Sequence, residues 1–453
     1  MRTFLVILLV LAASPAPAVD FAKIGKLVEP LIEADGMVGC VVGIIDGDKQ
    51  EVRGYGSIHR GMNDKPTGDT IYEIGSVTKA FTGTLLAEMA KRGEVKLDTP
   101  LQDLLPAGVK LQLLQDKPIR LVDVASQTSG LPRLPDNFAP ADKSNPYADF
   151  NAERLFEFLR NYKLPRAPGT YEYSNLGMGM LGYLLATKVG KSYEELLVDR
   201  IAGPLKMTDT RIKLSDEQLK RLAPGHNGEL DTVKNWDLNV LAGAGGIRST
   251  ANDLMKFATA ALADDKTPVV EAIQEAWKPR YGKQGEIGTG LGWHIARDGV
   301  TRFHNGQTGG YTAAVFLFKP KKMGVVVVCN TATDKTDILA ERIIQTMFGM
   351  SPPPIDVRKV VKVAPEVLKQ YEGVYALSLF FGITVTVENG KLMAQATGQD
   401  KVQIYPESES KFFYKVVDAQ IEFTKGKDGQ VDKLVLHQNG QSLPGVKVPP
   451  VKK

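Results

Sequence analysis

The chain lacks the residue patterns that mark metal sites, membrane spans and nucleic-acid binding. Its 453 residues include two cysteines and five histidines, and neither C-x-x-C nor H-E-x-x-H occurs, so the sequence gives no support for a zinc site. After the N-terminal segment, no apolar run is long enough to span a bilayer. The 56 Lys and Arg residues nearly balance 52 Asp and Glu residues, and the net charge of +4 gives no argument for a nucleic-acid partner.

The remaining composition is that of an ordinary folded protein. Hydrophobic residues make up 43% of the chain and charged residues 24%, which excludes a disordered or collagen-like chain. At roughly 100–200 residues per domain, the length predicts two or three domains.

The first residues have the pattern of a secretory signal peptide. Arg2 supplies a positive charge, residues 4–13 form a short apolar run, and Ala-Pro-Ala at residues 16–18 fits a cleavage site. We therefore expect residues 1–18 to be removed and the mature protein to be soluble and exported, either periplasmic or secreted. No membrane span is expected in the mature form.

Cys40 and Cys329 both lie in apolar, strand-like runs far apart in the sequence. An exported protein permits a disulfide between them. Two buried thiols are the favoured interpretation, because free cysteine is among the residues most often found in protein cores.

The order of predicted elements indicates one sheet built from both ends of a domain. Residues 38–55 predict a hairpin, helical patterns dominate from about residue 76 to 262, and strand character returns at 311–330. Helices between two sets of strands favour an α+β fold, in which an antiparallel sheet packs against helices.

The C-terminal part of the chain has a different character. Ser-Pro-Pro-Pro at residues 351–354 is a stiff, extended break. From Tyr371 onward, hydrophobic residues alternate with polar ones, and turn signals separate seven or eight short strands. The pattern predicts a small antiparallel barrel or sandwich.

The first catalytic candidate is Ser76 with Lys79. Ser76 opens a helical pattern, and a spacing of three places Lys79 on the same helix face. Lys79 is the only charged residue between Gly75 and Ala87, and a lysine in apolar surroundings tends toward a lowered pKa and can serve as a base. A serine at a helix start also lies beside free N–H donors for an oxyanion. A helix cap followed by a surface lysine is the alternative.

Tyr173-Ser174-Asn175 follows a Gly/Pro loop and precedes an apolar helix. A tyrosine beside a lysine ammonium loses its proton more easily and can act as a general base. The Asn175 amide can both donate and accept hydrogen bonds, and thus contact a lysine and a substrate amide together. Taken alone, the triplet is more typical of a loop tyrosine and a capping asparagine.

The third candidate is the glycine-rich stretch His304-Asn305-Gly306-Gln307, directly before a predicted strand. Small residues at a strand edge allow a ligand to approach the backbone closely. The alternative is a glycine-rich hairpin loop. The other histidines, His59, His226, His294 and His437, are isolated in the sequence and are interpreted as structural.

The ordered motifs S-x-x-K, Y-x-N and H-x-G resemble those of the serine β-lactamase and penicillin-binding protein superfamily. The resemblance is to the class C-like branch, with its DD-carboxypeptidase/endopeptidase, D-aminopeptidase and esterase relatives. Similar stretches lie at residues 72–76, 93–98, 119–123, 127–132 and 245–250. The segment from Tyr371 resembles the lipocalin-like barrel appended to some serine hydrolases of this group.

This resemblance implies a domain organisation. Residues 19–350 would form the β-lactamase-like hydrolase domain, in which an antiparallel sheet flanked by helices faces a mostly helical lobe. Residues 351–365 would be a Pro-rich linker, and residues 366–453 a lipocalin-like β-barrel.

The resemblance also implies roles for the motif residues. Ser76 would be the acylated nucleophile, and Lys79 and Tyr173 would share the proton transfers. Asn175 would orient Lys79 and the acyl side chain, and the backbone N–H groups of Ser76 and Gln307 would form the oxyanion hole. The expected substrate-binding residues are Asn175, His304, Asn305, Gly306 and Gln307.

The third motif departs from the K-T-G that β-lactamases of this branch usually carry, since His304 stands in the lysine position. A neutral histidine anchors a substrate carboxylate less well than a lysine. We nevertheless expect His304 to contact that carboxylate, with a strength that depends on its protonation.

The implied activity is hydrolysis of an amide or ester, of the D-Ala-D-Ala peptide or β-lactam type, through an acyl-enzyme on Ser76. Carboxylesterase and D-aminopeptidase activity are alternatives, and a muropeptide or penicillin sensor without turnover is an alternative from another class. The partner is a small-molecule or peptide substrate, and no metal or organic cofactor is expected.

One further motif is interpreted as packing. Residues 177–182 match the dinucleotide-binding pattern G-x-G-x-x-G, which requires a buried strand directly before it. The preceding residues, 168–172, are loop-like, so we expect these glycines to allow close helix packing.

Overall fold

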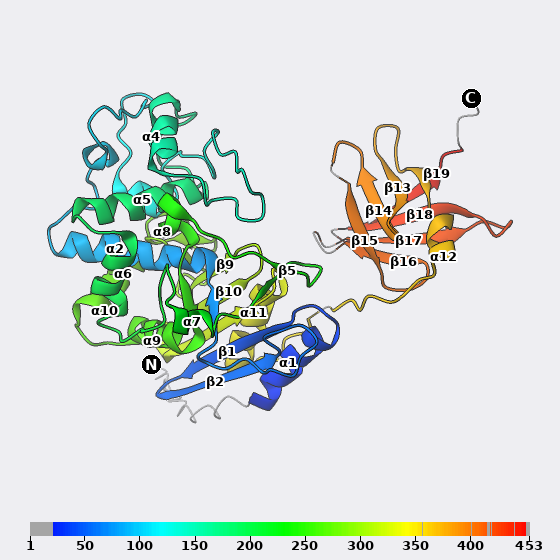
Figure 1. The fold of residues 1–453 in the computed structure, drawn as a ribbon, viewed down its shortest axis with the longest axis horizontal. Coiled ribbons are helices and arrows are strands. Elements are labelled where there is room, and N and C mark those ends of the chain that lie inside the picture. The colour runs from blue at the N-terminus through cyan, green and yellow to red at the C-terminus, as the bar shows by residue number, and fades with distance from the viewer. Residues whose placement is uncertain are drawn as a thin grey trace, which may run out of the picture. The chain divides into compact units, whose positions relative to one another are not determined.

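The computed structural model describes residues 21–355, 357–399, 401–414, 417, 419–438 and 440–449. The predicted signal peptide, residues 1–18, lies outside the described residues. The chain divides into two compact units, the first ending at Ile355 and the second following it (Figure 1). This division falls inside the predicted linker, residues 351–365.

The first unit is built on a seven-stranded sheet assembled from both ends of the domain, as expected from the sequence. The strand order is β2-β1-β11-β10-β9-β8-β7, and the described pairings are antiparallel. The strands are β1 (Gly39–Asp46), β2 (Lys49–Gly56), β7 (Gly288–Thr289), β8 (His294–Ile295), β9 (Arg302–Gln307), β10 (Thr312–Phe318) and β11 (Met323–Cys329).

The centre of this sheet is wholly apolar. Every residue of β11 is buried, as its Val-rich run predicts, because helices α9 and α11 pack against it. The pairing of β1 with β11 places Cys40 opposite Cys329. Both are buried, free thiols, in agreement with the favoured interpretation of the sequence.

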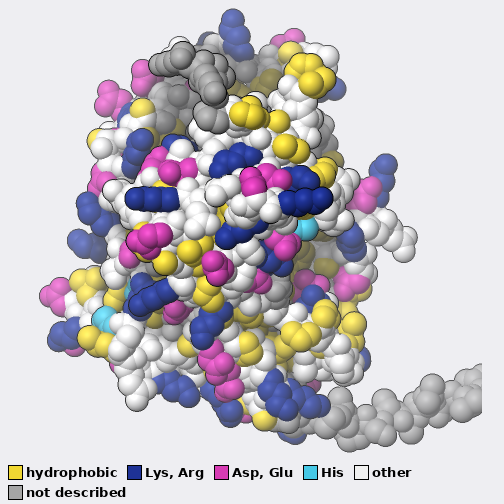
Figure 2. Space-filling view, turned by 90° about the vertical axis from the view of Figure 1, so that its right-hand side faces the viewer, with side chains coloured by type: hydrophobic (Ala, Val, Ile, Leu, Met, Phe, Trp, Pro, Cys, Tyr) yellow, Lys and Arg dark blue, Asp and Glu magenta, His cyan; other side chains and the backbone are white. Residues whose placement is uncertain are grey.

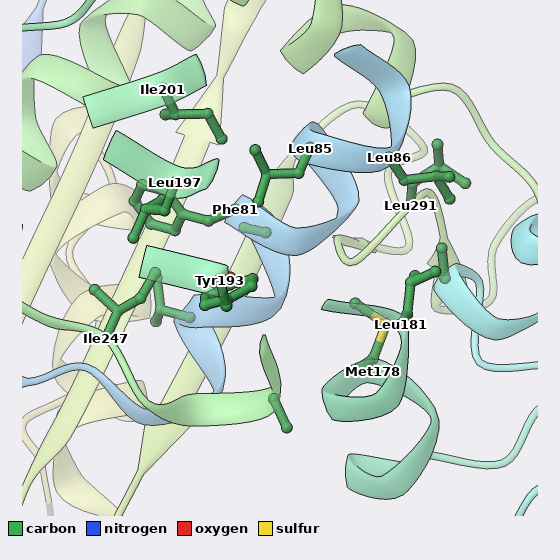
Figure 3. Packing of buried hydrophobic residues seen from close by; sticks show 14 of the residues in the cluster. Phe81, Leu85, Leu86, Met178, Leu181, Tyr193, Leu197, Ile201, Ile247 and Leu291 are labelled. Carbon is green, nitrogen blue, oxygen red and sulfur yellow. The ribbon is translucent and has the colours of Figure 1, made fainter. Parts of the chain in front are cut away.

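The helical lobe surrounds α2 (Thr78–Lys91), the helix that begins just after Ser76. Twelve of its fourteen residues are buried, including Lys79, so it is a central helix rather than an amphipathic surface helix. Figure 3 shows its residues between side chains of α5 (Asn175–Lys188), α6 (Tyr193–Leu197) and the following turn, η3 (Val198–Ala202). Phe81 and Leu85 point toward Leu197 and Ile201 (Figure 3). The core around α2 therefore fixes the position of the S-x-x-K motif.

Shorter elements complete the first unit. The other helices are α1 (Phe21–Glu33), α3 (Leu121–Ala125), α4 (Ala152–Asn161), α7 (Asp216–Leu219), α8 (Ala242–Gly245), α9 (Ala251–Leu262), α10 (Pro268–Ala276) and α11 (Lys335–Met347). The 3₁₀ turns are η1 (Gly75–Val77), η2 (Leu101–Leu104), η4 (Asn239–Leu241) and η5 (Lys319–Lys321). Two small sheets pair β3 (Ile71–Glu73) with β6 (Arg248–Thr250), and β4 (Gly225–His226) with β5 (Thr232–Val233).

The G-x-G-x-x-G stretch lies inside α5 and serves helix packing, as the sequence indicated. A Cβ on Gly179 would lie 2.7 Å from the Cα of Leu241, and a Cβ on Gly182 would lie 2.9 Å from the Cα of Gly243. Glycine therefore allows the backbone of α5 to approach its neighbours η4 and α8 closely.

The second unit is a closed eight-stranded barrel, which settles the choice between barrel and sandwich. Closure occurs where β12 pairs with β19, so that Tyr375 lies opposite Lys447. The short helix α12 (Pro365–Gln370) precedes β12. The strands are β12 (Gly373–Ala376), β13 (Gly382–Glu388), β14 (Lys391–Ala396), β15 (Val402–Pro406), β16 (Lys411–Tyr414), β17 (Ala419–Lys425), β18 (Val431–Gln438) and β19 (Gln441–Lys447).

The barrel has its own core, which includes the stacked rings of Tyr371 and Phe423 with centroids 4.3 Å apart. A separate core is the property of an independently folding domain. Across the face drawn in Figure 2, Lys and Arg side chains are interspersed with Asp and Glu, in keeping with the small net charge. None of the helices in the described ranges combines the length and apolar character needed to cross a bilayer.

We predict that the first unit folds and reacts without the barrel. A chain shortened to residues 21–355 retains the buried Ile355 and the complete seven-stranded sheet. It should unfold cooperatively and react with a fluorophosphonate probe at Ser76 as fast as the full chain, within about twofold. Gel fluorescence and circular dichroism measure both properties. A truncated protein that is folded but unlabelled would show that the barrel supplies part of the site.

Candidate active site

Ser76 and Lys79 are in direct contact at the start of the central helix. Ser76 lies in the 3₁₀ turn η1 (Gly75–Val77) and Lys79 in the first turn of α2. The Nζ of Lys79 donates to Ser76 Oγ at 2.9 Å and to the carbonyl oxygen of Ala244 in α8 at 2.7 Å. A heavy-atom distance of 2.9 Å is within reach of proton transfer.

The environment of Lys79 lowers the basicity of its amine. The side chain is fully buried, and no ion pair between Lys79 and an acidic side chain occurs among the described residues. Burial, reinforced by the positive charge of Arg133, lowers the pKa of Lys79 well below its usual value of 10.5. A neutral amine can accept the proton of Ser76, so the structure supports Lys79 as the base.

Tyr173 contacts the same serine from the other side. Its side chain hydrogen-bonds Ser76, and the Nζ of Lys79 lies 4.8 Å from the centroid of its ring. Burial raises the pKa of Tyr173 well above 10, although the hydrogen bond with Ser76 and the charge of Arg133 partly oppose this. The raised pKa of Tyr173 differs from the expectation of an easily ionised tyrosine. That expectation assumed a lysine ammonium beside the phenol, whereas burial drives Lys79 toward its neutral form. The phenol is therefore a proton donor or relay in the resting protein.

The loop at residues 127–133 fixes the position of Tyr173. The backbone N–H of Ser174 donates to Gln127 Oε1 at 2.6 Å, and Ser174 Oγ donates to the carbonyl of Pro132 at 2.6 Å. The N–H of Asn175 donates to the carbonyl of Arg133 at 3.1 Å. Gln127 adopts a left-handed backbone with φ of 63° at the start of this loop. Residues distant in sequence thus determine where the second motif lies.

Glycines bring the third motif against the serine. A Cβ on Gly306 would lie 2.0 Å from the carbonyl oxygen of Ile74 and 2.7 Å from the backbone nitrogen of Ser76. On the facing segment, Gly75 has a φ of 49°, and a Cβ on it would lie 2.6 Å from the backbone nitrogen of Gln307. Only glycine fits at these two positions. The nitrogens of Ser76 and Gln307 consequently lie on facing backbones, as an oxyanion hole requires.

His304 lies behind the site rather than in its wall. Its ring is buried, its Nδ1 is 2.6 Å from the carbonyl oxygen of Asn305, and it does not line the cavity over Ser76. Burial and the neighbouring His294 lower the pKa of His304 well below 6.5, so the ring is uncharged in the neutral range. This placement argues against the expected contact of His304 with a substrate carboxylate.

The cavity over Ser76 has a volume of about 550 Å³ and contains most of the predicted site residues. Ser76, Tyr173, Asn175, Asn305, Gly306 and Gln307 all line it. The Asn175 side chain hydrogen-bonds Tyr147, whereas the described hydrogen bonds of the Lys79 amine go to Ser76 and Ala244. The expected orientation of Lys79 by Asn175 is therefore not found among the described contacts.

Several lining residues were missed by the sequence analysis. They are Arg133, Tyr147, Trp236, His294, Asp334 and Asp337. His294, which we interpreted as isolated, stacks on Tyr173 with ring centroids 6.3 Å apart. Burial, followed by the charge of Lys79, lowers the pKa of His294 to about 4, so its ring is neutral. Arg133 directly follows residues 127–132, a stretch that supports the family resemblance, and this position was the signal available in the sequence.

The wall of the cavity also includes two acidic residues, Asp334 and Asp337. Asn305 Nδ2 donates to Asp337 Oδ2 at 2.5 Å, and burial raises the pKa of the Asp337 carboxyl to about 6. Asp334 is nearby and forms an ion pair with Lys335 at 3.4 Å. Among the described residues, no group of three or more His, Cys, Asp or Glu side chains is arranged to bind a metal ion.

Comparison with known proteins agrees with this geometry. Residues 24–346 match the Beta-lactamase family, and residues 357–446 match a family described as Domain of unknown function (DUF3471). Penicillin-binding protein 4* of Bacillus subtilis (strain 168) is 24% identical over 456 residues, which cover 93% of this chain and 97% of that protein.

Solved structures of similar proteins share the fold of the first unit. A β-lactamase/D-alanine carboxypeptidase from Yersinia pestis, complexed with citrate, is 27% identical, with a TM-score of 0.64 over 73% of this chain and 99% of that one. A class C β-lactamase from Rhodobacter sphaeroides is 24% identical, with a TM-score of 0.61 over 72% of this chain and 99% of that one.

The relative that carries the assignment is D-alanyl-D-alanine-carboxypeptidase/endopeptidase AmpH of Escherichia coli (strain K12). It is 30% identical over 339 residues, which cover 70% of this chain and 86% of that protein. Since this similarity and the family match both span the domain that contains Ser76, Lys79 and Tyr173, the chain belongs to the β-lactamase family of serine hydrolases.

Proposed function

We propose that this serine hydrolase is exported and cleaves an amide bond of D-alanyl cell-wall peptides through an acyl-enzyme on Ser76. The observation that carries the proposal is the contact of one serine hydroxyl with both Lys79, at 2.9 Å, and Tyr173. The similarity to a D-alanyl-D-alanine-carboxypeptidase/endopeptidase supports the substrate class, and the signal-peptide pattern at residues 1–18 supports export.

Acylation begins with proton transfer from Ser76 Oγ to the neutral Lys79 amine. The oxygen attacks the substrate carbonyl, and the negative charge that develops on the carbonyl oxygen is stabilised by the N–H groups of Ser76 and Gln307. Burial lowers the pKa of Lys79 well below 10.5 and so favours the uncharged amine that accepts the serine proton.

Collapse of the tetrahedral intermediate breaks the C–N bond. The leaving nitrogen takes a proton from the Tyr173 hydroxyl, which regains one from the Lys79 ammonium, so that the net proton transfer is from Ser76 to the amine product. Water then attacks the ester on Ser76 with the same groups acting as base, and the acid product leaves while Ser76 regains its proton. Every atom and proton in the cycle is supplied by substrate, water and these three side chains.

One observation favours ester hydrolysis as a second candidate. In place of K-T-G the chain has the motif His304-Asn305-Gly306, whose histidine is buried and uncharged. Asp337 lies next to Asn305 in the wall of the cavity. A substrate with a free carboxylate near Asn305 would meet a like charge, whereas a neutral ester or amide would not.

The proposed function is tested by intact-mass detection of an acyl-enzyme. Purified protein should gain the mass of the acyl group when mixed with a D-Ala-D-Ala peptide thioester or a fluorescent penicillin, and Ser76→Ala should gain none. Continued release of product identifies an enzyme. A stable adduct without turnover would instead indicate a penicillin-binding sensor, and equal labelling of Ser76→Ala would exclude Ser76 as the nucleophile.

Lys79 and Tyr173 should behave as one proton-transfer unit. Lys79→Ala and Tyr173→Phe should each lower kcat by on the order of a thousandfold, and the double variant should lose little more, because residues that act together give non-additive losses. Steady-state kinetics on a neutral ester measures this, with thermal unfolding as the control for folding. Losses that multiply in the double variant would show that the two groups act independently.

The pH profile should report the lowered pKa of Lys79. Below that pKa the amine is an ammonium ion and cannot accept the serine proton, so kcat/KM for a neutral ester should rise with pH and level off well below pH 10.5. Measurement over about pH 5 to 10.5 tests this. A rise that continues to about pH 10.5 would mean that the Lys79 amine keeps its ordinary pKa and stays protonated in the neutral range.

A further inference from the structure

The cavity over Ser76 has an uneven distribution of charge. Arg133 is the only Lys or Arg among the described residues that line it, and Asp334 and Asp337 lie on another part of its wall. The Asp334 charge is offset by Lys335, while Asp337 contacts Asn305. A substrate therefore meets a guanidinium in one part of the cavity and a carboxyl group in another.

The Arg133 side chain is exposed, and its guanidinium forms no ion pair with any residue in the described ranges. Its Cζ lies 5.1 Å from the centroid of the Tyr173 ring. Its charge also acts on the titration of Lys79, Tyr147 and Tyr173, in keeping with a guanidinium near the reacting groups. The cation is thus available to a ligand within reach of the catalytic serine.

The backbone of Arg133 is fixed, so its side chain starts from a defined place beside Tyr173. Its carbonyl oxygen accepts the N–H groups of Asn175 and Leu176 at 3.1 and 3.2 Å, at the start of α5. The preceding residue, Pro132, accepts the Ser174 hydroxyl. Arg133 and Tyr173 are therefore placed by the same set of hydrogen bonds.

We propose that Arg133 binds a carboxylate of the substrate and sets the specificity of this site for anionic substrates. A guanidinium presents two parallel N–H donors that match the two oxygens of a carboxylate. His304 is unavailable for this contact because it is buried and uncharged, and Asp337 repels a carboxylate from the Asn305 part of the cavity. The inference rests on the proposed function, since it assigns the substrate contact of the same acyl-transfer site.

The test uses two pairs of substrates, in which the members of each pair differ only in a carboxylate. In the first pair the carboxylate is on the acyl chain: 4-nitrophenyl hydrogen glutarate and its carboxamide, 4-nitrophenyl glutaramate. In the second it is on the leaving group: the thioester of benzoylglycine with thioglycolic acid, and the same thioester with thioglycolamide. The pair that responds shows whether Arg133 binds the acyl or the leaving part.

The variants are Arg133→Gln, Arg133→Lys and, as a matched control, Arg160→Gln on α4, an exposed arginine that does not line the cavity. In at least one pair, the native protein should prefer the carboxylate member by about tenfold or more in kcat/KM, the effect expected of a charge-assisted hydrogen bond. Arg133→Gln should reduce this preference to about twofold or less, with most of the change in KM.

Arg133→Lys should keep part of the preference, and Arg160→Gln should keep all of it. Arg133 also lowers the pKa of Lys79, so Arg133→Gln should move the rise of the pH profile upward for both members of a pair equally. Only the ratio within a pair therefore measures carboxylate binding.

The proposal is overturned if no native preference for a carboxylate exists in either pair, or if Arg133→Gln retains it. Either result can occur while the neutral esters still acylate Ser76, in which case the proposed hydrolase function stands. If the neutral esters fail to acylate Ser76, the proposed function itself is wrong. Circular dichroism and the unfolding temperature of each variant exclude misfolding as a cause.

Discussion

The active site depends on the burial of one amine. Lys79 is fully enclosed by the core around α2, and its hydrogen bonds go to the serine hydroxyl and a backbone carbonyl rather than to a carboxylate. A carboxylate partner would stabilise the ammonium form and hold the pKa of Lys79 high. Packing of the helical lobe around a lysine without a carboxylate partner therefore lowers its pKa and makes it a base. The favourable packing of that lobe offsets the free-energy cost of burying the amine.

Close backbone contacts bring the remaining parts of the site to this amine. Gly83 and Gly292 lie where α2 meets the segment before β8, and a Cβ on either would lie 1.9 Å from a carbonyl oxygen of the other segment. Gly75 and Gly306 allow a similar approach between the serine turn and β9. Small changes in these contacts would separate Ser76 from the oxyanion nitrogen of Gln307, so the glycines are as important to the geometry as the polar residues.

The electrostatics of the cavity follow from burial as much as from residue type. Burial keeps His294 and His304 neutral, raises the pKa of Tyr173, and lowers that of Lys79. The fixed positive charge that remains in the cavity wall is Arg133, while Asp337 contributes an acid with a pKa of about 6. The cavity thus combines catalytic groups that burial drives toward their uncharged forms with charged side chains in its wall, an arrangement suited to selecting substrates by their charge.

By itself, the sequence determined the local patterns. The strand-like runs at residues 38–55 and 311–330 predicted one sheet built from both ends of the domain, alternation predicted the C-terminal strands, and the spacing of Ser76 and Lys79 predicted that they share a helix face. These succeeded because residues three apart on a helix share a face, and strand faces repeat every two residues. Only the tertiary structure decided that His304 is buried, that His294 and Arg133 line the cavity, and that the C-terminal strands close into a barrel. The burial of a side chain and the closure of the barrel depend on contacts between segments that are distant in the sequence. Examples are the pairing of β12 with β19 and the hydrogen bond between the 127–133 loop and the segment that carries Tyr173, and the local spacing of residues does not predict such contacts.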